Sequence, residues 1–216
     1  MRIPVVDNYS NTSQIINLPI AKPVPVEREF GLFNDKDRIK LIKTIEKIVR
    51  GSDEYKQYIQ YLKKGIDMSR CSFFNNVNGD IPKIRLEIHH EPFTLFDITN
   101  IVLSSFIKRE LPLNPLMISD EIMLLHYRNM VGLIPLSSTV HGLVHDGKIM
   151  IPLQCVYGDY MSFIDEYYDS IPEDVLNALQ AKISMSKDVQ SVDTSILNKK
   201  YVYLDVDGFR LPQSIE

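Results

Sequence analysis

Hydrophobic positions in the first part of the chain recur with the spacing of helices. Between Asn34 and Gly51 the apolar residues fall three or four positions apart, and a second run of this kind lies between Ser52 and Gly65. Serine is a frequent helix N-cap, and glycine often follows a helix C-terminus. The pattern predicts two helices that pair as an N-terminal hairpin, after about 30 residues that are rich in proline and have little helical periodicity.

The period then changes from helical to strand-like. In KIRLEIHH, residues 83–90, apolar and charged side chains alternate, which is typical of a half-buried strand. Thr94 and Asp97 form a capping pair that predicts the start of a long periodic helix, and a shorter helix is predicted over 118–129. The run MVGLIPL, residues 130–136, contains a proline and therefore predicts an edge strand or a strand-like loop.

The remaining pattern predicts further short elements. SSTVHGLVHDG, residues 137–147, predicts a helix that a serine caps and a glycine ends. Beyond it, residues 148–156 are expected to form a strand, Pro172 to begin a helix, and residues 201–212 to form a hairpin around an Asp-Gly turn.

These elements predict an α+β protein in three parts. Residues 1–80 hold an extended segment and the helical hairpin, and residues 81–150 hold a core with a helical insertion at about 94–129. Residues 151–216 form an extension that packs on this core. With 44% apolar and 24% charged residues among 216, the chain can form one core and is neither fibrous nor disordered.

Composition also limits where the protein is expected in the cell and which residues can bind a metal. No apolar run approaches the ~20 residues of a membrane helix, and the N-terminal sequence lacks a secretory pattern. We therefore expect a cytoplasmic protein without membrane contact, in the host cytoplasm if a phage encodes it. Cys71 and Cys155 are isolated, which excludes a cysteine zinc ribbon and argues against a disulfide framework. Any metal must be held by histidines and carboxylates.

Four of the five histidines fall in two clusters. His89 and His90 end the strand predicted over 83–90, where successive side chains point to opposite faces. His141 and His145 lie four positions apart on a predicted helix, hence on one face. Such a helical pair suits a divalent metal with a third ligand from another element, and His89 or His90 can supply that ligand. Each cluster alone also has an ordinary interpretation. A His-His pair often ends a strand with its hydrogen bonds satisfied locally, and two histidines can be four positions apart on a helix by chance.

The two clusters together resemble a known nuclease signature. The order E-x-H-H, followed by L-x-P-L-S-x-x-V-H-x-x-V-H, is similar to the HNH nucleases of the His-Me finger class, especially colicin-type DNases and HNH proteins encoded by bacteriophages. The likeness covers roughly residues 83–150. The match rests on Glu87, His89, His90, Leu133, Pro135, Leu136, Ser137, Val140, His141, Val144 and His145.

The resemblance implies a ββα-metal finger and a metal-dependent endonuclease that hydrolyses phosphodiester bonds in DNA. It implies that His89, His141 and His145 hold a divalent ion (Zn, Mg, Mn or Ni) and that His90 is the general base. This division agrees with elementary chemistry, because an uncoordinated imidazole with a pKa of ~6.5 can accept a proton near neutral pH. Glu87 either orients a ligand or a nearby arginine, or is a solvated carboxylate.

The chain departs from this family pattern in two ways. Where many members have an asparagine or histidine before L-x-P-L-S, this chain has Gly132, which has no side chain to orient anything. Asn129 and His126 lie a few residues upstream and are candidates to replace the missing side chain. The predicted catalytic residues are therefore His90, Glu87 and Asn129. His126 can equally well be a residue on a helix surface. The link between His90 and Leu133 is also longer than usual, because it contains two predicted helices.

Nucleic-acid contact is predicted for one lysine-rich helix. Lys40, Lys43 and Lys47 recur on it and can contact DNA phosphates, although a solvated helix face is an equally good interpretation. The net charge of −4 argues against a protein that coats nucleic acid by bulk electrostatics.

Two classes of function therefore stay open beside the nuclease prediction. The alternative is a catalytically degenerate module that binds DNA or a protein partner in a phage replication, packaging or transcription assembly. Gly132 and the acidic composition favour this alternative, whereas the general base implied at His90 opposes it. A purely structural zinc protein fits least well, because a closed site normally has four protein ligands.

Overall fold

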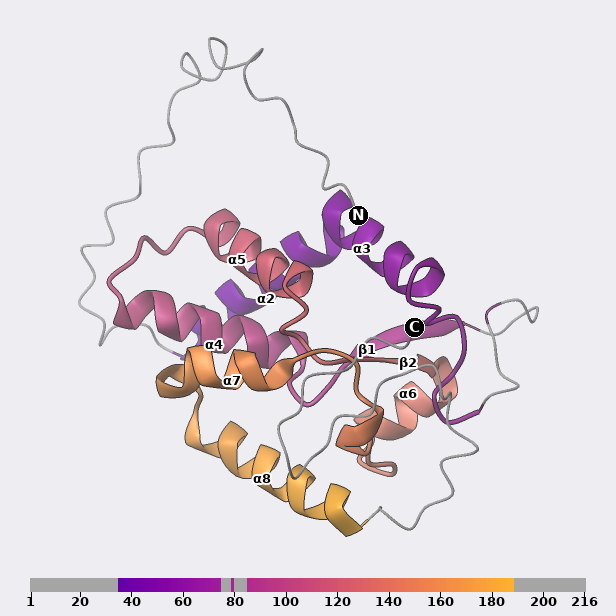
Figure 1. The fold of residues 1–216 in the computed structure, drawn as a ribbon. Coiled ribbons are helices and arrows are strands. Elements are labelled where there is room, and N and C mark those ends of the chain that lie inside the picture. The colour runs from indigo at the N-terminus through magenta and orange to yellow at the C-terminus, as the bar shows by residue number, and fades with distance from the viewer. Residues whose placement is uncertain (1–34, 75–78, 80–84, 189–216) are drawn as a thin grey trace. The chain divides into compact units, whose positions relative to one another are not determined.

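The structure, a computed structural model, describes residues 35–74, 79 and 85–188. Within these residues the fold is α+β, rich in helices, with a two-stranded antiparallel sheet (Figure 1). The elements in chain order are α2 (Asp35–Gly51), α3 (Asp53–Lys64), β1 (Leu86–His90), α4 (Leu95–Lys108), α5 (Pro115–Tyr127), β2 (Leu133–Ser137), α6 (Ser138–His145), η1 (Leu153–Cys155), α7 (Tyr160–Tyr167), η2 (Tyr168–Ser170) and α8 (Glu173–Asp188).

Helices α2, α4 and α5 pack together in the apolar core. The helix α2 packs against both α4 and α5, in addition to the predicted partner α3. Because the buried residues recur at helical spacing, each helix presents one continuous apolar stripe to its neighbours. These stripes contain Ile42, Ile45 and Val49 of α2, Ile98, Ile101 and Val102 of α4, and Ile118, Ile122 and Leu125 of α5.

Helix starts follow the capping residues seen in the sequence. The Ser52 side chain accepts a hydrogen bond from the Tyr55 N–H at the start of α3. Thr94 and Asp97 form a complete capping box at the start of α4. Helix α5 begins at Pro115 with Asn114 as its cap, three residues before the predicted start, because proline is well suited to the first turn of a helix.

The strands β1 and β2 pair antiparallel, with Leu86 opposite Ser137 and His90 opposite Leu133. All five residues of β2 are buried, whereas β1 has half-buried positions in its middle. Helix α6 follows β2 directly, because the last strand residue, Ser137, is also the N-cap that accepts the Val140 N–H. The helix α6 contacts both strands, and His89 near the end of β1 lies beside the two histidines of α6.

The prediction of a strand over residues 148–156 is wrong. The segment instead contains the short 3₁₀ turn η1, which follows Pro152. Proline has no N–H to give to a sheet, and the Leu153 N–H is taken by the Ser186 hydroxyl of α8. Helix α7 was missed by the sequence pattern, and the hairpin predicted over 201–212 lies outside the described residues.

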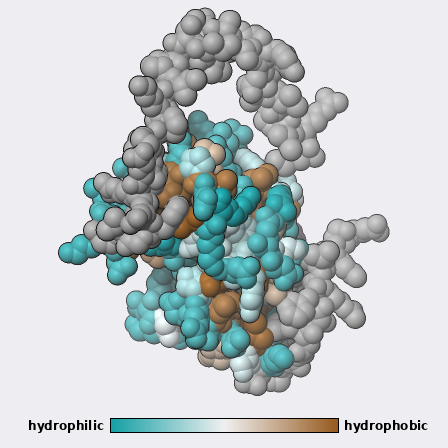
Figure 2. All heavy atoms as spheres, turned by 90° about the vertical axis from the view of Figure 1, so that its left-hand side faces the viewer, coloured by the Kyte–Doolittle hydropathy of each residue, from teal (hydrophilic) through white to brown (hydrophobic). Residues whose placement is uncertain are grey.

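Apolar side chains also reach the surface along α5. Leu116, Met117, Leu124 and Tyr127 are each 45–60% exposed. Figure 2 shows hydrophobic patches that interrupt the hydrophilic surface on the side of the molecule that lies at the left of Figure 1. None of the described helices combines the length and the apolar character needed to cross a bilayer.

Candidate metal site

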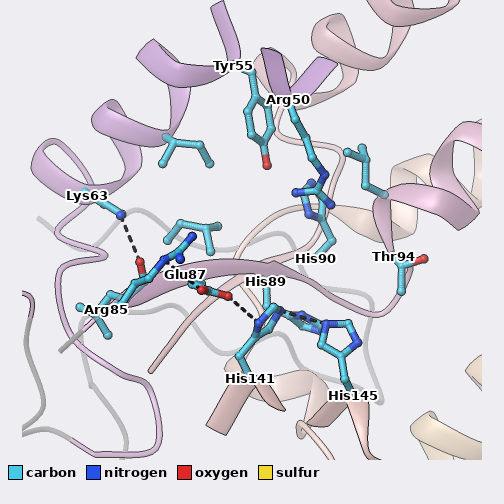
Figure 3. Close-up of a pocket in the computed structure, with 14 residues that line it drawn as sticks. Arg50, Tyr55, Lys63, Arg85, Glu87, His89, His90, Thr94, His141 and His145 are labelled. Carbon is cyan, nitrogen blue, oxygen red and sulfur yellow. Dashed lines mark hydrogen bonds and ion pairs between the residues drawn. The ribbon is translucent and has the colours of Figure 1, made fainter. Parts of the chain in front are cut away.

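Three histidines from β1 and α6 converge at one point. His89, His141 and His145 each offer a ring nitrogen, and these three atoms all lie within 4.8 Å of one another. The convergence follows from local structure, since the pleat of β1 directs His89 toward α6 and one helical turn stacks His145 on His141. Figure 3 shows the three rings gathered on one side of β1.

The spacing of the nitrogens suits a small metal ion. His141 Nε2 and His145 Nε2 are 3.1 Å apart. Two nitrogens bound at 2.0–2.1 Å in a tetrahedral arrangement would be separated by about 3.3 Å. Within the described residues, no further histidine, cysteine or carboxylate joins this group, so three protein ligands would leave one tetrahedral position for another ligand.

Glu87 orients one of these rings. Its Oε2 lies 2.6 Å from His141 Nδ1, and its Oε1 lies 3.1 Å from Arg85 Nε. The carboxylate therefore accepts the Nδ1–H of His141, which leaves the Nε2 lone pair directed at the cluster. A carboxylate in this position is common behind histidines that bind metals. Glu87 thus contacts both a histidine and an arginine, and this arrangement leaves it less solvated than a free surface carboxylate.

The surroundings of His141 favour its neutral form. The pKa of His141 is lowered from its ordinary value, first by burial and then by the nearby His89 and His145, while Glu87 opposes this shift. A lowered pKa keeps the ring deprotonated at neutral pH, and only a deprotonated nitrogen can bind a metal. His141 therefore has a lone pair available to bind a cation.

Glu91 is a feature of the site that the sequence analysis missed. This carboxylate is buried, and its Oε2 lies 3.5 Å from His89 Nε2. Its Oε1 forms an ion pair with Lys182 Nζ, which also donates to the Pro92 carbonyl at 3.0 Å. The contact links α8 to the site across about 90 residues of sequence. The only signal in the sequence was a glutamate directly after the two histidines.

His90 points away from the cluster and into the core. It is 4% exposed, its ring stacks on Tyr55, and its Nε2 lies 3.0 Å from His126 Nε2. His126 is also buried, with 1% exposed, so its interpretation as a residue on a helix surface is wrong. Figure 3 shows His90 with Tyr55 and Arg50 on the side of β1 opposite His141 and His145.

The protonation of this second pair follows from its partners. His126 Nδ1 lies 2.7 Å from the Ile122 carbonyl, which can only accept, so Nδ1 carries the proton. In the neutral ring the Nε2 of His126 is then the acceptor, and His90 donates its Nε2–H to it. Burial lowers the pKa of His90 well below its ordinary value and that of His126 to about 4. Both rings are therefore neutral core residues.

Asn129 and Gly132 have structural roles in the chain between α5 and β2. Asn129 has a left-handed backbone (φ 60°), and the N–H groups of Asn129 and Met130 return to the carbonyls of His126 and Leu125. This is a Schellman ending of a helix. At Gly132 an added Cβ would lie 1.8 Å from the Glu91 carbonyl oxygen. The position where many HNH proteins have a side chain has no room for one here.

Lys40, Lys43 and Lys47 are exposed on one face of α2. They lie on a different part of the surface from the histidine cluster, since the cavity around the cluster and the shallow groove along these lysines have no residue in common. Arg38, from the same basic run, is instead used internally, where its guanidinium donates to Asn100 and Ser104 of α4.

Comparison with known proteins favours one of the two classes of function. No significant match was found among curated proteins or among solved structures. The family model of the bacteriophage G278-like virion proteins matches residues 25–208. The identification as an HNH endonuclease is therefore wrong, and with it the assignment as a DNA hydrolase with His90 as general base; the match gives no support to DNA binding by the lysines either. The chain belongs to the bacteriophage G278-like virion protein family.

Proposed function

We propose that this protein is an assembly component of the phage particle that binds a protein partner there, and that its β1, β2 and α6 form a ββα unit that holds a structural metal ion. The virion role rests on the family match over residues 25–208. It agrees with the alternative interpretation of the sequence, in which the motif serves an assembly.

The metal part of the proposal rests on the convergence of His89, His141 and His145. Three imidazoles favour Zn²⁺ over Mg²⁺, because nitrogen ligands suit zinc and magnesium prefers oxygen. A bound ion would cross-link the end of β1 to α6, which otherwise contact each other through few apolar residues; Val140 is the one buried residue of α6. Such a link would stabilise the sheet. Because the described residues supply three ligands and a closed structural site normally has four, the fourth ligand would come from outside these residues.

The surface supports an assembly role as well. The exposed apolar residues of α5, Leu116, Met117 and Leu124 among them, are of the kind that pack against other proteins. In a particle built of many chains, these side chains would become buried.

Two measurements, one on phage particles and one on the purified protein, test the two parts of the proposal. Mass spectrometry of particles banded in a density gradient is expected to detect the protein at a fixed ratio to the major capsid or tail subunit. Its absence from intact particles would exclude the virion role. Elemental analysis of the purified protein after dialysis against Zn²⁺ is expected to give one zinc per chain, and a value near zero would exclude the metal site independently.

A further inference from the structure

The two outer edges of the sheet differ in how their backbone groups are paired. On the outer edge of β2, Leu133 exchanges two hydrogen bonds with Tyr157, at 2.7 and 2.8 Å. The Pro135 carbonyl accepts the Ser72 N–H at 2.9 Å, and proline has no N–H of its own. The Ser137 N–H contacts Cys71 Sγ at 3.4 Å. Every outward group described here on β2 is therefore paired, and Pro135 blocks further pairing.

The register shows which groups of β1 face outward. The Glu91 N–H donates to the Gly132 carbonyl and the Ser138 N–H to the Arg85 carbonyl, both at 3.0 Å. In an antiparallel pair, residues that bond to the partner strand alternate with residues that do not. Since Arg85 and Glu91 bond to β2, the main-chain groups of Leu86, Ile88 and His90 point to the other edge. Ile88 lies opposite Pro135, which agrees with this assignment.

The outer edge of β1 has little pairing within the described part of the chain. The Leu86 carbonyl accepts a hydrogen bond from Lys63 Nζ at 3.2 Å. For the N–H and C=O groups of Ile88 and His90, no described residue is a partner. Unpaired groups along a strand are a template for another strand.

A cavity lies along this edge. Its volume is about 360 Å³, and it is lined by all six consecutive residues from Arg85 to His90. A cavity on one face of a strand would be lined by every second residue, because side chains alternate between faces. Because the lining includes consecutive residues, from both faces of the strand, the cavity lies along the edge of β1. Figure 3 shows the β1 strand crossing this space, with Arg50 and Tyr55 on one side and His141 on the other.

The cavity is rich in positive charge. Arg50, Lys63 and Arg85 line it, and Glu87 is the one carboxylate of the lining. Arg85 pairs with Glu87, and Lys63 with a carbonyl, whereas Arg50 has no hydrogen bond to a described residue. Arg50 interacts electrostatically with Glu46 of the same helix, and its guanidinium donors, which have no described hydrogen-bond acceptor, suit a further carboxylate.

We propose that β1 receives an added strand, an extended segment of a neighbouring protein in the particle that has an acidic side chain directed at Arg50. This inference rests on the proposed virion role and names the partner chemistry for it. Added strands of this kind bind through main-chain hydrogen bonds, with side-chain pockets setting specificity. A nucleic-acid phosphate does not fit as well, because it offers no N–H to the outward carbonyls of Ile88 and His90.

Hydrogen exchange of single amides tests the proposal in the protein as it exists. The Ile88 amide faces outward, and the adjacent His89 amide faces β2, so His89 is an internal control. In the free protein, Ile88 is expected to exchange much faster than His89. In intact particles its exchange should slow by about 100-fold or more, as for an amide in a paired strand. Fast exchange of Ile88 in particles overturns the proposal, and so does protection in the free protein, since the chain itself would then close this edge.

Matched variants test the same edge by incorporation into particles. Ile88→Pro removes the outward N–H and leaves the bonds to β2, while Ile88→Val keeps the N–H; the first should be lost from particles and the second retained. Arg50→Glu should lower incorporation at least about tenfold through like-charge repulsion, whereas Lys47→Glu on the same helix should not. If Ile88→Pro and Ile88→Val are incorporated equally, no strand is added to β1. If Arg50→Glu and Lys47→Glu are incorporated equally, the added strand has no acidic side chain at Arg50. If even the unaltered protein is absent from particles, the virion role fails instead.

Discussion

The two faces of β1 use the same residue type in opposite ways. On the α6 face, His89 lies beside two other histidines and two carboxylates, Glu87 and Glu91, and the cluster extends from the buried His89 to the exposed His145. On the opposite face, the buried His90 lies against His126 and Tyr55, and no carboxylate of the described residues is in hydrogen-bond contact with it. One face collects groups that stabilise a cation, and the other face repels one.

The comparison shows that sequence neighbours owe their roles to the strand pleat and to what each face meets. Burial lowers the pKa of His90 and of His141 alike. For His141 the shift leaves a lone pair directed at two other rings, whereas for His90 it leaves a neutral donor to His126. A perturbed histidine is therefore evidence of a binding site only where its free nitrogen faces other ligands.

The largest expected effect is the loss of zinc affinity when a histidine on the α6 face is removed. A structural zinc site contributes ~10–16 kcal/mol, so one ligand accounts for on the order of 4 kcal/mol, or about 1,000-fold in affinity. His145→Ala, at an exposed position, should lower zinc affinity by about that factor. His126→Gln, on the opposite face, should leave it unchanged. Competition titrations with a chromophoric chelator measure both; equal losses would mean that the two faces are not distinct.

Without metal, a substitution on the His90 face should lower the free energy of unfolding more than one on the α6 face. His90→Ala removes the donor to His126 Nε2 and leaves a cavity beside Tyr55, which should lower the free energy of unfolding by about 2–4 kcal/mol. His145→Ala should change it by less than about 0.5 kcal/mol, since the side chain is exposed. Urea unfolding in the presence of a chelator gives both values. A greater loss for His145→Ala would reverse the assignment of the two faces.

The buried pair also predicts how stability depends on pH. His126 has a pKa of about 4 in the folded protein and ~6.5 when unfolded, so the unfolded state binds more protons between these values. The free energy of unfolding should therefore fall as the pH drops from about 6.5 to 4, by on the order of 3 kcal/mol. Unfolding of the chelated protein at several pH values measures the slope. His126→Leu should reduce the slope, and His90, whose pKa is also lowered by burial, should account for what remains; an unchanged slope would show that His126 does not contribute.

Local patterns were sufficient for most elements near the site. The alternation before His90 predicted β1, and Ser52 and Thr94 predicted the starts of α3 and α4, because caps and periodicity act over a few residues. The convergence of His89 with His141 and His145 could also be anticipated, because it follows from one strand pleat and one helical turn.

Features that depend on distant contacts were not predictable. The Glu91 carbonyl fills the space at Gly132, and Lys182 reaches Glu91 from α8. His126 is a core residue because it packs against His90, Tyr55 and Tyr58, which come from other elements. The resemblance to nucleases failed for a similar reason, since a short ββα motif describes local geometry and does not determine what a whole chain does.

The smallest expected effect concerns the carboxylate behind His141. Glu87→Gln keeps an acceptor for the Nδ1–H of His141 but removes the charge, so zinc affinity should fall by about tenfold, the lower end of what such outer partners contribute. Asp146→Asn makes the same charge change next to His145, yet Asp146 pairs with Lys148 instead of a ring, and it should leave the affinity unchanged. The chelator competition used for His145→Ala resolves a tenfold shift. If both variants lose affinity equally, the effect of Glu87 is general electrostatics; if neither does, the contact with His141 does not orient a metal ligand.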